Sequence, residues 1–249
     1  MQKTILEQTP DEFKKFVIIL KSFNSANTIA INEGKMLISI IGGLVIQEFP
    51  EYPDLKMRFT RVKETITIIS ALVKLKIDRV HWEEHNTHYL LKVYHNDSFS
   101  PIKINLPKSD SSSDNLEIPD LSLYQQTYNK GIDKNTISTI LTATKEFQNN
   151  GQTDVILKLS DNGQLGMFKV QDKISSAEID IPVEDIQANK TLKINELYNG
   201  KATGNIVINI QQDKRNRDNY LVITYLENDP TRKTLQFSEI EDESTPQFF

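Results

Sequence analysis

The sequence predicts an α+β fold made of two tandem copies of one unit, each with a prominent helix packed on antiparallel strands. Two helix candidates begin and end alike, and each is followed by an alternating apolar and polar run that contains a tight turn. The halves also close alike, because the pattern Tyr-Leu, three residues, Tyr begins at Tyr89 and again at Tyr220. This repeated order predicts a diverged duplication with its helices on one face of the sheets.

The expected domain boundaries follow from the repeat and from a change in composition. At 249 residues the chain is long enough for two domains of common size. The segment 108–120 is rich in Ser and Asp, which is typical of an extended surface connector. We therefore expect an N-terminal domain over 1–107, a connector over 108–120, a C-terminal domain over 121–243 and a tail, STPQFF, over 244–249.

The first helix candidate begins after Thr9 and Pro10, a common helix start. In DEFKKFVIILKSF the apolar residues recur at helical spacing and turn inward. The outer arc then carries Lys14, Lys15 and Lys21. These lysines make the exposed face of this helix predominantly basic.

Two further helix candidates carry the rest of the polar helical surface. The segment RVKETITIISALVKL buries Val62, Ile66, Ile69 and Val73 and exposes a flank with cations at both ends. The segment KNTISTILTATKEF is capped by Asp133 and is rich in hydroxyls. A counterpart of the second helix, around TLKINELYNG, has room for about one or two turns of ~3.6 residues.

Two hairpins follow the first and third helices. TIAINEGKMLISI is broken at Gly34, and TDVILKLSDNGQLGMFKV is broken at Asn162-Gly163. Glycine and Asn-Gly permit the positive φ angles that tight hairpin turns need. Both segments are therefore predicted to form pairs of antiparallel strands.

Composition excludes several classes of function. The chain has no cysteine, so disulfides, thiol nucleophiles and thiolate metal sites are excluded. No apolar run approaches the ~20 residues of a membrane span, and the N-terminus lacks the order of a secretory signal. We expect an intracellular protein, cytoplasmic if bacterial or phage and nuclear if eukaryotic. A net charge of −5 argues against bulk coating of nucleic acid but allows one basic face.

The segment VHWEEHNTHYLLKVYH contains all four histidines, and His81, Glu84 and His85 match the zinc motif HxxEH. That motif needs both histidines on one face of a helix. The flanking β-branched and aromatic residues instead favour two strands joined by a polar turn. No phosphate-binding loop, dinucleotide fingerprint or nucleophile elbow is present. We expect no catalytic residues, metal or cofactor, with a zinc hydrolase as a remote alternative.

The order of elements resembles the DNA sliding clamps, the ring-shaped polymerase processivity factors. The resemblance rests on FKKFVIILKSF as the first inner helix, LEIPDLSLYQQTY as the connector, TDVILKLSDNGQLGMF as a hairpin, and YLVITYLEND with KTLQFSEIEDE as the C-terminal end. It implies a non-enzymatic clamp whose helices line a hole around duplex DNA, with three subunits in the ring. Its partners would be a DNA polymerase and an ATP-driven loader.

The resemblance also implies two sets of site residues. The DNA-facing set is Lys14, Lys15, Lys21, Arg61, Lys63, Lys74, Lys76, Lys134, Lys145, Lys190, Lys193 and Lys201. The partner-docking set is Leu44, Ile46, Leu116, Ile118, Pro119 and Phe237.

The resemblance further implies that two edge strands, FSPIKINLP and SSAEIDIP, pair between subunits. The alternatives are a clamp-like subunit that does not close a ring, and a single-stranded DNA-binding protein with an acidic, aromatic-ended tail. The lack of stacking aromatics counts against the second.

Overall fold

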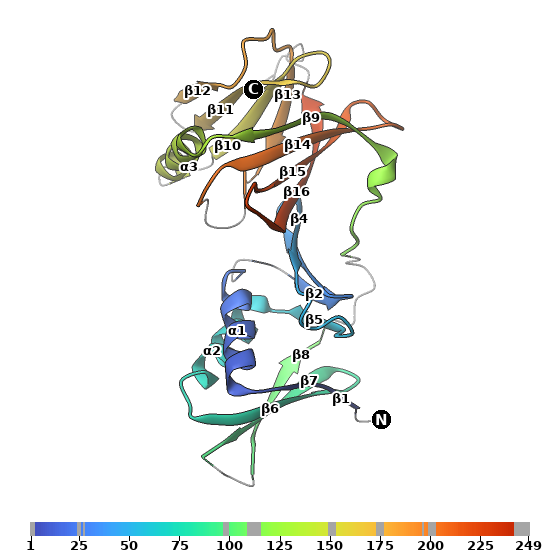
Figure 1. Cartoon of the computed structure of the whole chain (residues 1–249), viewed down its shortest axis with the longest axis vertical. Coiled ribbons are helices and arrows are strands. Elements are labelled where there is room, and N and C mark those ends of the chain that lie inside the picture. Colours follow the sequence, from blue (N-terminus) through green and yellow to red (C-terminus); the bar gives the residue numbers. More distant parts are fainter. Residues whose placement is uncertain are drawn as a thin grey trace, which may run out of the picture. The chain divides into compact units, whose positions relative to one another are not determined.

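The computed structural model describes residues 3–23, 26, 28–96, 100–108, 116–148, 153–172, 177–195, 197–198 and 203–241. The chain divides into two compact units (Figure 1). Unit 1 comprises Met1–Ile40 and Gln47–Glu117, and unit 2 comprises Ile41–Ile46 and Ile118–Phe249. The predicted tail, 244–249, lies outside the described residues.

The described residues of unit 1 form two helices and two groups of antiparallel strands. Strands β1, β6, β7 and β8 form a sheet in that order, and β3, β2 and β5 are adjacent in a second group. The bounds are β1 Lys3–Gln8, α1 Pro10–Lys21, β2 Thr28–Asn32, β3 Lys35–Ile40, β5 Met57–Thr60, α2 Val62–Leu72, β6 Ile77–Glu84, β7 His88–His95 and β8 Ile102–Pro107.

The core of unit 1 is rich in aromatic side chains. The rings of Phe16 and Phe59 lie edge-on to Trp82, with centroids 5.8 and 6.1 Å from it. The buried indole N–H of Trp82 donates to the Gln8 side-chain oxygen at 2.9 Å, which satisfies its one polar atom. Helix α1 packs against α2, β1 and β6, so its apolar face closes this core.

Unit 2 contains one α-helix among its described residues. Its strands form two groups, β9-β14-β15-β16 and β12-β11-β10-β13. The bounds are η1 Leu121–Leu123, β9 Tyr124–Ile132, α3 Lys134–Gln148, β10 Thr153–Leu159, β11 Leu165–Asp172, β12 Glu178–Pro182, β13 Lys190–Ile194, β14 Ile206–Asp213, β15 Asn219–Leu226 and β16 Asp229–Glu241.

The two units repeat one topology. The sheet β1-β6-β7-β8 corresponds in chain order to β9-β14-β15-β16, and β3-β2-β5 corresponds to β11-β10-β13. Helix α1 follows β1 as α3 follows β9, and each helix packs on antiparallel strands. The predicted α+β fold with tandem units is therefore confirmed.

The predicted short helix around TLKINELYNG is wrong over its described part. Residues Lys190–Ile194 form β13, which pairs with β10 and with the end of β16. Among the described residues of unit 2, nothing corresponds to α2. Leu197 and Tyr198, which follow β13, are buried in the core of unit 2 instead.

The predicted hairpin turns form with the expected backbone geometry. Between β2 and β3, Glu33 and Gly34 both have positive φ, 51° and 68°. Between β10 and β11, Gly163 has a φ of 73°. Positive φ at these positions matches the strand twist and explains the glycines.

A short segment of the first half of the sequence belongs to unit 2. Residues Ile41–Ile46, which include most of β4 (Gly43–Glu48), lie beside β16. The Phe237 amide donates to the Gly42 carbonyl at 3.1 Å. A Cβ on Gly43 would lie 2.1 Å from the Leu235 carbonyl oxygen, so only glycine allows the strands to approach this closely.

Candidate nucleic-acid interface and docking surface

Helix α1 presents the predicted basic face. Thr9 and Glu12 form a reciprocal capping box, which fixes the start of the helix. Phe13, Phe16, Val17 and Leu20 are buried as predicted, and this burial orients the helix. Lys14, Lys15 and Lys21 are exposed on the opposite side, around Ile18, which is 58% exposed.

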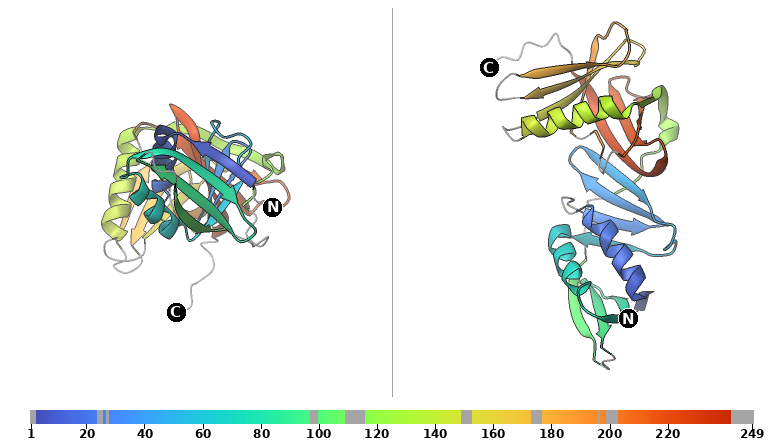
Figure 2. Two further views of the ribbon diagram at one scale, coloured as in Figure 1. Left: turned by 90° about the horizontal axis from the view of Figure 1, so that it is seen from below. Right: turned by 60° about the vertical axis from the view of Figure 1, so that its left-hand side comes forward.

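Helix α2 lies beside α1 in unit 1 (Figure 2). Its apolar side buries Val62, Ile66 and Ile69 as predicted, whereas Val73 is half-buried at the C-cap. Arg61 precedes the helix in a left-handed conformation, φ 51°, and makes no side-chain cap bond. The exposed cations on and around this helix are Arg61, Lys63, Lys74 and Lys76.

Helix α3 is capped by Asp133, as predicted. The carboxylate accepts from the amides of Asn135 and Thr136 at 2.9 and 3.1 Å and from the Thr136 hydroxyl at 2.6 Å. The Thr136 hydroxyl bond is the main cause that lowers the pKa of Asp133. Lys134 and Lys145 are exposed on this helix, among the hydroxyls of Ser138, Thr139 and Thr142.

Within the described residues, the helical lysines form no ion pair with a carboxylate, whereas several cations elsewhere do. Among the described residues, Lys92, Lys108, Lys130, Lys169 and Arg215 form ion pairs with carboxylates. Arg61 lies 3.8 Å from Glu64, but both side chains are about two-thirds exposed, so this pair contributes little. No such pair within the described ranges involves Lys14, Lys15, Lys21, Lys63, Lys74, Lys76, Lys134 or Lys145.

The three remaining DNA-facing candidates are not placed on a helix. Lys193 lies in β13 and pairs with Asp154 at 2.6 Å. Lys190 is at the start of β13 and donates to the Asp161 carbonyl at 2.8 Å. Lys201 lies outside the described residues. The structure therefore brings together the candidates of α1 and α2 and leaves Lys190 and Lys193 on the sheet.

An apolar surface forms in unit 2 where residues 41–46 meet β16. Phe237 is 50% exposed and Ile41 is 76% exposed. Ile41 is next in sequence to Gly42, whose carbonyl accepts a hydrogen bond from the Phe237 amide. Leu44 and Ile46, predicted for docking, are buried. Exposed aromatic and aliphatic side chains that adjoin buried ones are typical of a docking surface for a short peptide.

The segment 116–121, which includes the end of the connector, also exposes apolar side chains. Ile118 is 38% exposed and Leu121 is 45% exposed, whereas Leu116 and Pro119 are half-buried. Leu121 was not predicted from the sequence. It belongs to η1, whose N-cap Asp120 accepts from the Ser122 amide at 3.0 Å.

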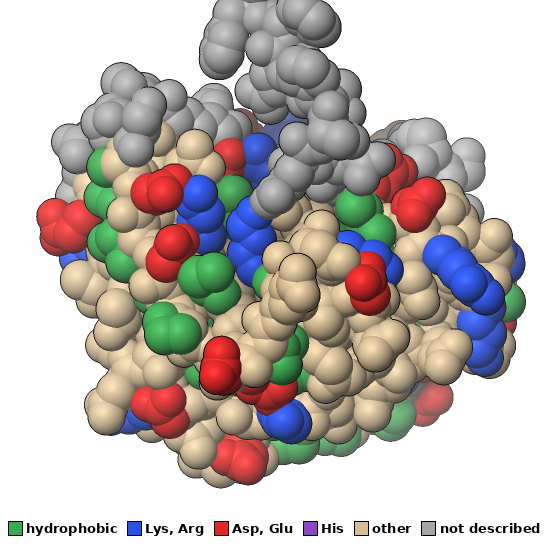
Figure 3. All heavy atoms as spheres, turned by 90° about the horizontal axis from the view of Figure 1, so that it is seen from above, with side chains coloured by type: hydrophobic (Ala, Val, Ile, Leu, Met, Phe, Trp, Pro, Cys, Tyr) green, Lys and Arg blue, Asp and Glu red, His purple; other side chains and the backbone are tan. Residues whose placement is uncertain are grey.

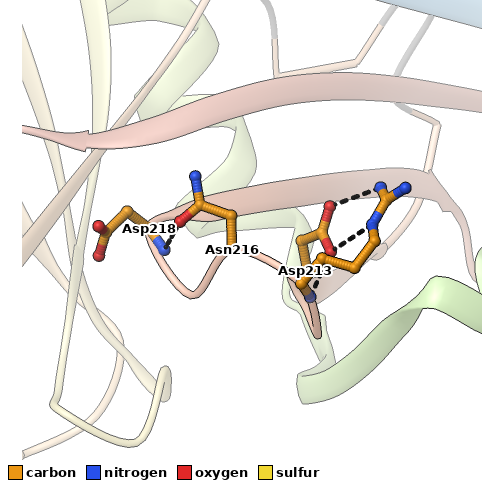
Figure 4. A network of polar contacts seen from close by, with 4 residues as sticks. Asp213, Asn216 and Asp218 are labelled. Atoms are coloured by element: carbon orange, nitrogen blue, oxygen red, sulfur yellow. Dashed lines mark hydrogen bonds and ion pairs between the residues drawn. The ribbon is translucent and has the colours of Figure 1, made fainter.

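The hairpin between β14 and β15 binds η1, which directly follows the connector. The Lys214 amide donates to the Leu123 carbonyl at 2.9 Å, and its ammonium donates to the Ser122 carbonyl at 2.8 Å. In the same hairpin, Asp213 faces the guanidinium of Arg215 (Figure 4). These side-chain bonds, 3.1 and 2.8 Å long, lower the pKa of Asp213 to about 2.

The HxxEH segment does not form a helix. His81 lies in β6, 3.9 Å from the Glu7 carboxylate, and His85 follows the end of that strand. The rings of His85 and His88 are stacked with centroids 4.6 Å apart. Within the described residues, no group of three or more acidic, His or Cys side chains is arranged to hold a metal. The helical zinc geometry therefore does not fit, and the predicted strand-turn-strand does.

The sequence has no match among protein-family models, and no curated protein matches it by sequence. The structure does match solved proteins. A DNA polymerase sliding clamp from Pseudomonas aeruginosa aligns with a TM-score of 0.56 and 12% identity over 96% of this chain and 65% of that chain.

Two further bacterial structures agree with that match. The beta subunit of DNA polymerase from Streptococcus pyogenes gives a TM-score of 0.57 and 11% identity, over 96% of this chain and 66% of that one. DNA polymerase III subunit beta from Borrelia burgdorferi gives 0.56 and 13%, over 96% and 62%.

This chain spans less than two thirds of the length of these three proteins. It has the fold of the DNA polymerase sliding clamps. No helix of the described residues is long and apolar enough to cross a membrane.

Proposed function

We propose that the protein is a DNA polymerase sliding clamp, a non-enzymatic processivity factor that encircles duplex DNA and tethers replication proteins. The observation that carries the proposal is a sliding-clamp fold whose paired helices in unit 1 present lysines without ion-pair partners in the described residues. Exposed lysines can contact phosphates without reading bases. Such contacts suit a protein that must move along DNA of any sequence.

The proposed ring has three subunits joined through strand edges. In the sheet orders, β8 ends one sheet of unit 1 and β12 ends one sheet of unit 2. A pairing of the same kind already exists within the chain. By chain order, β4 is the counterpart of β12 and β16 is the counterpart of β8, and β4 and β16 are paired with each other. A head-to-tail repeat of this pairing between copies, β12 on β8, generates a closed ring when the rotation permits.

The edge strands have side chains suited to such pairing. Ile179 is 37% exposed in β12, and Ile102 and Ile104 alternate with exposed Lys103 in β8. Pro182 and Pro107 end the two strands and limit the length of any pairing. An intersubunit interface would cover these isoleucines.

The proposed partners dock on the apolar surface of unit 2. Exposed apolar area comes from Phe237, Ile41, Ile118 and Leu121. Leu44 and Ile46 belong to β4 and are buried. A polymerase or another replication protein would insert a short peptide with aromatic and aliphatic side chains here. A loader ATPase would open the ring, because no nucleotide-binding loop is found in the sequence.

The alternative is a clamp-like subunit that binds DNA without closing a ring. One observation favours it: the described part of unit 2 has one α-helix where unit 1 has two, so its helical surface is smaller. Such a protein would stay on DNA through direct contacts and would not encircle it.

Solution mass separates the two proposals. Sedimentation equilibrium of the 28.6 kDa chain should give a mass close to three subunits. The double variant Ile102→Asp with Ile179→Asp places charges on both proposed edges and should give monomers that keep the circular dichroism of the unaltered protein. A protein that stays monomeric at all concentrations and on DNA would refute the ring.

A further inference from the structure

The positive charge on the helices is divided unequally between the two units. Unit 1 carries seven cations on and beside its helices and three acidic residues, a net charge of +4 over segments 9–23 and 61–76. In unit 2, segment 133–148 has two lysines, Asp133 and Glu146, a net charge of zero. The difference concerns the two surfaces that the proposed function assigns to DNA.

The difference is built into corresponding positions of the two inner helices. Counted from the caps Thr9 and Asp133, the positions of Lys14 and Lys15 in α1 are occupied by Ser138 and Thr139 in α3. The Thr139 hydroxyl is already engaged with the Asn135 carbonyl at 3.0 Å. The exposed surface of α3 is therefore neutral and hydroxyl-lined where that of α1 is cationic.

The described residues of unit 2 hold no counterpart of α2, which is the second source of charge in unit 1. Helix α2 and its flanks supply four of the seven unit 1 cations. In unit 2, Lys193 lies in β13, the counterpart of β5, and forms an ion pair with Asp154. A groove of about 320 Å³ runs beside α3, lined by Lys134, Ile137, Ser138, Leu141, Thr142, Lys145 and Glu146. Val17, which corresponds to Leu141, is fully buried in unit 1, whereas Leu141 is half-exposed.

One further face of the molecule carries both signs of charge. The face drawn in Figure 3 intersperses Lys and Arg with Asp and Glu side chains. Mixed charges of this kind cancel within about one Debye length, ~8 Å at physiological salt. Among the three helices, the positive charge available to a phosphate backbone therefore comes mainly from α1 and α2.

We infer that unit 1 holds the duplex through Lys14, Lys15, Lys21, Lys63, Lys74 and Lys76, while α3 of unit 2 gives a neutral sector of the same hole. This inference rests on the proposed function. In a ring of three subunits, three cationic sectors alternate with three neutral ones, and the duplex lies against unit 1. Fewer strong phosphate contacts per turn leave the ring able to slide.

Matched charge variants test the assignment. The variant Lys14→Gln with Lys15→Gln removes two charges from α1, and Lys134→Gln with Lys145→Gln removes two from α3. All four side chains are exposed, so folding should be unchanged. Affinity for a labelled linear duplex is measured by fluorescence anisotropy over a series of salt concentrations.

The α1 pair should weaken binding by roughly tenfold and flatten the slope of log K against log salt by up to about 1.8, near 0.9 for each lost phosphate contact. The α3 pair should weaken binding less than about twofold and leave the slope close to that of the unaltered protein. Adding Ser138→Lys and Thr139→Lys to the α1 pair should restore most of the lost affinity, because charge returns to the neutral sector.

Three outcomes contradict the inference. Equal losses for the two pairs would show that both units hold DNA, with the proposed clamp function intact. No gain from the added lysines would place α3 outside the path of the duplex. If the unaltered protein binds no duplex at the lowest salt, the proposed function fails and the assignment fails with it.

Discussion

The close approach of β4 to β16 makes Gly43 sensitive to substitution. In Gly43→Ala, the new Cβ would lie 2.1 Å from the Leu235 carbonyl oxygen and 3.1 Å from the Gln236 Cα. Nonbonded carbon contacts normally begin near ~3.5 Å, so one strand must move by more than about 1 Å. Both obstructing atoms belong to the backbone, which cannot rotate away as a side chain can.

The magnitude follows from the cost of overpacking. A forced shift of this kind costs about 1–3 kcal/mol, and each kcal/mol lowers Tm by ~2–4 °C in a chain of this size. We therefore expect Tm to fall by roughly 2–12 °C. Differential scanning calorimetry is the assay, and if the units unfold separately, only the unit 2 transition should move.

A matched control is Gly204→Ala. A Cβ there would meet the Asn228 side chain at 3.7 Å, an ordinary contact, so Tm should change by about 1 °C or less. Hydrogen exchange gives a second test, because the Phe237 amide donates to Gly42 and should lose protection only in Gly43→Ala. Equal Tm values for both variants, with Phe237 still protected, would refute the proposed steric conflict.

Three further predictions concern caps, pH and docking. Thr9→Ala and Asp133→Ala each remove a helix cap and should lower the free energy of unfolding by about 1 kcal/mol in urea titrations, whereas an unchanged midpoint would contradict the capping role. The pKa of Asp213 is lowered to about 2, so its contribution to stability is present above the ordinary pKa of Asp and is lost as pH falls from about 4 through 2. Asp213→Asn should therefore lose this part of the acid dependence of stability. An NMR titration midpoint near pH 4 for Asp213 would contradict the prediction. Phe237→Ala should weaken binding of a clamp-binding polymerase peptide by at least ~10-fold. Lys214→Met removes one of two bonds from Lys214 to η1 and should weaken peptide binding by ~2–5-fold, and both variants should keep their DNA affinity. Unchanged peptide affinity in calorimetric titrations would remove both residues from the docking surface.

Local signals in the sequence predict much of this fold. Apolar spacing and the caps Thr9 and Asp133 locate α1 and α3, because helix starts depend on adjacent residues. Gly34 and Gly163 mark turns for the same reason. The repeat adds the equivalence of the two halves, which no single motif could supply. The lysines of α1 and α2 follow directly from the helical periodicity.

Features that depend on distant residues were not predicted. TLKINELYNG has a weak local preference, and its pairing with β10 and β16 makes residues 190–194 a strand. Residues 41–46 belong to unit 2 because they lie beside β16, which is also a distant contact. The sequence Gly42-Gly43 does indicate that two backbones approach closely there. The bond from Lys214 to Ser122 of η1 joins residues 92 positions apart.

Retention on circular DNA tests the proposed clamp most directly. The protein is diluted until it dissociates into subunits and is then concentrated in the presence of nicked circular duplex, so that rings can close around the DNA without a loader. The proposed topology predicts that protein co-elutes with the circle at high salt and is released when one cut linearises it. Equal retention on circular and linear DNA, or none on either, would contradict it.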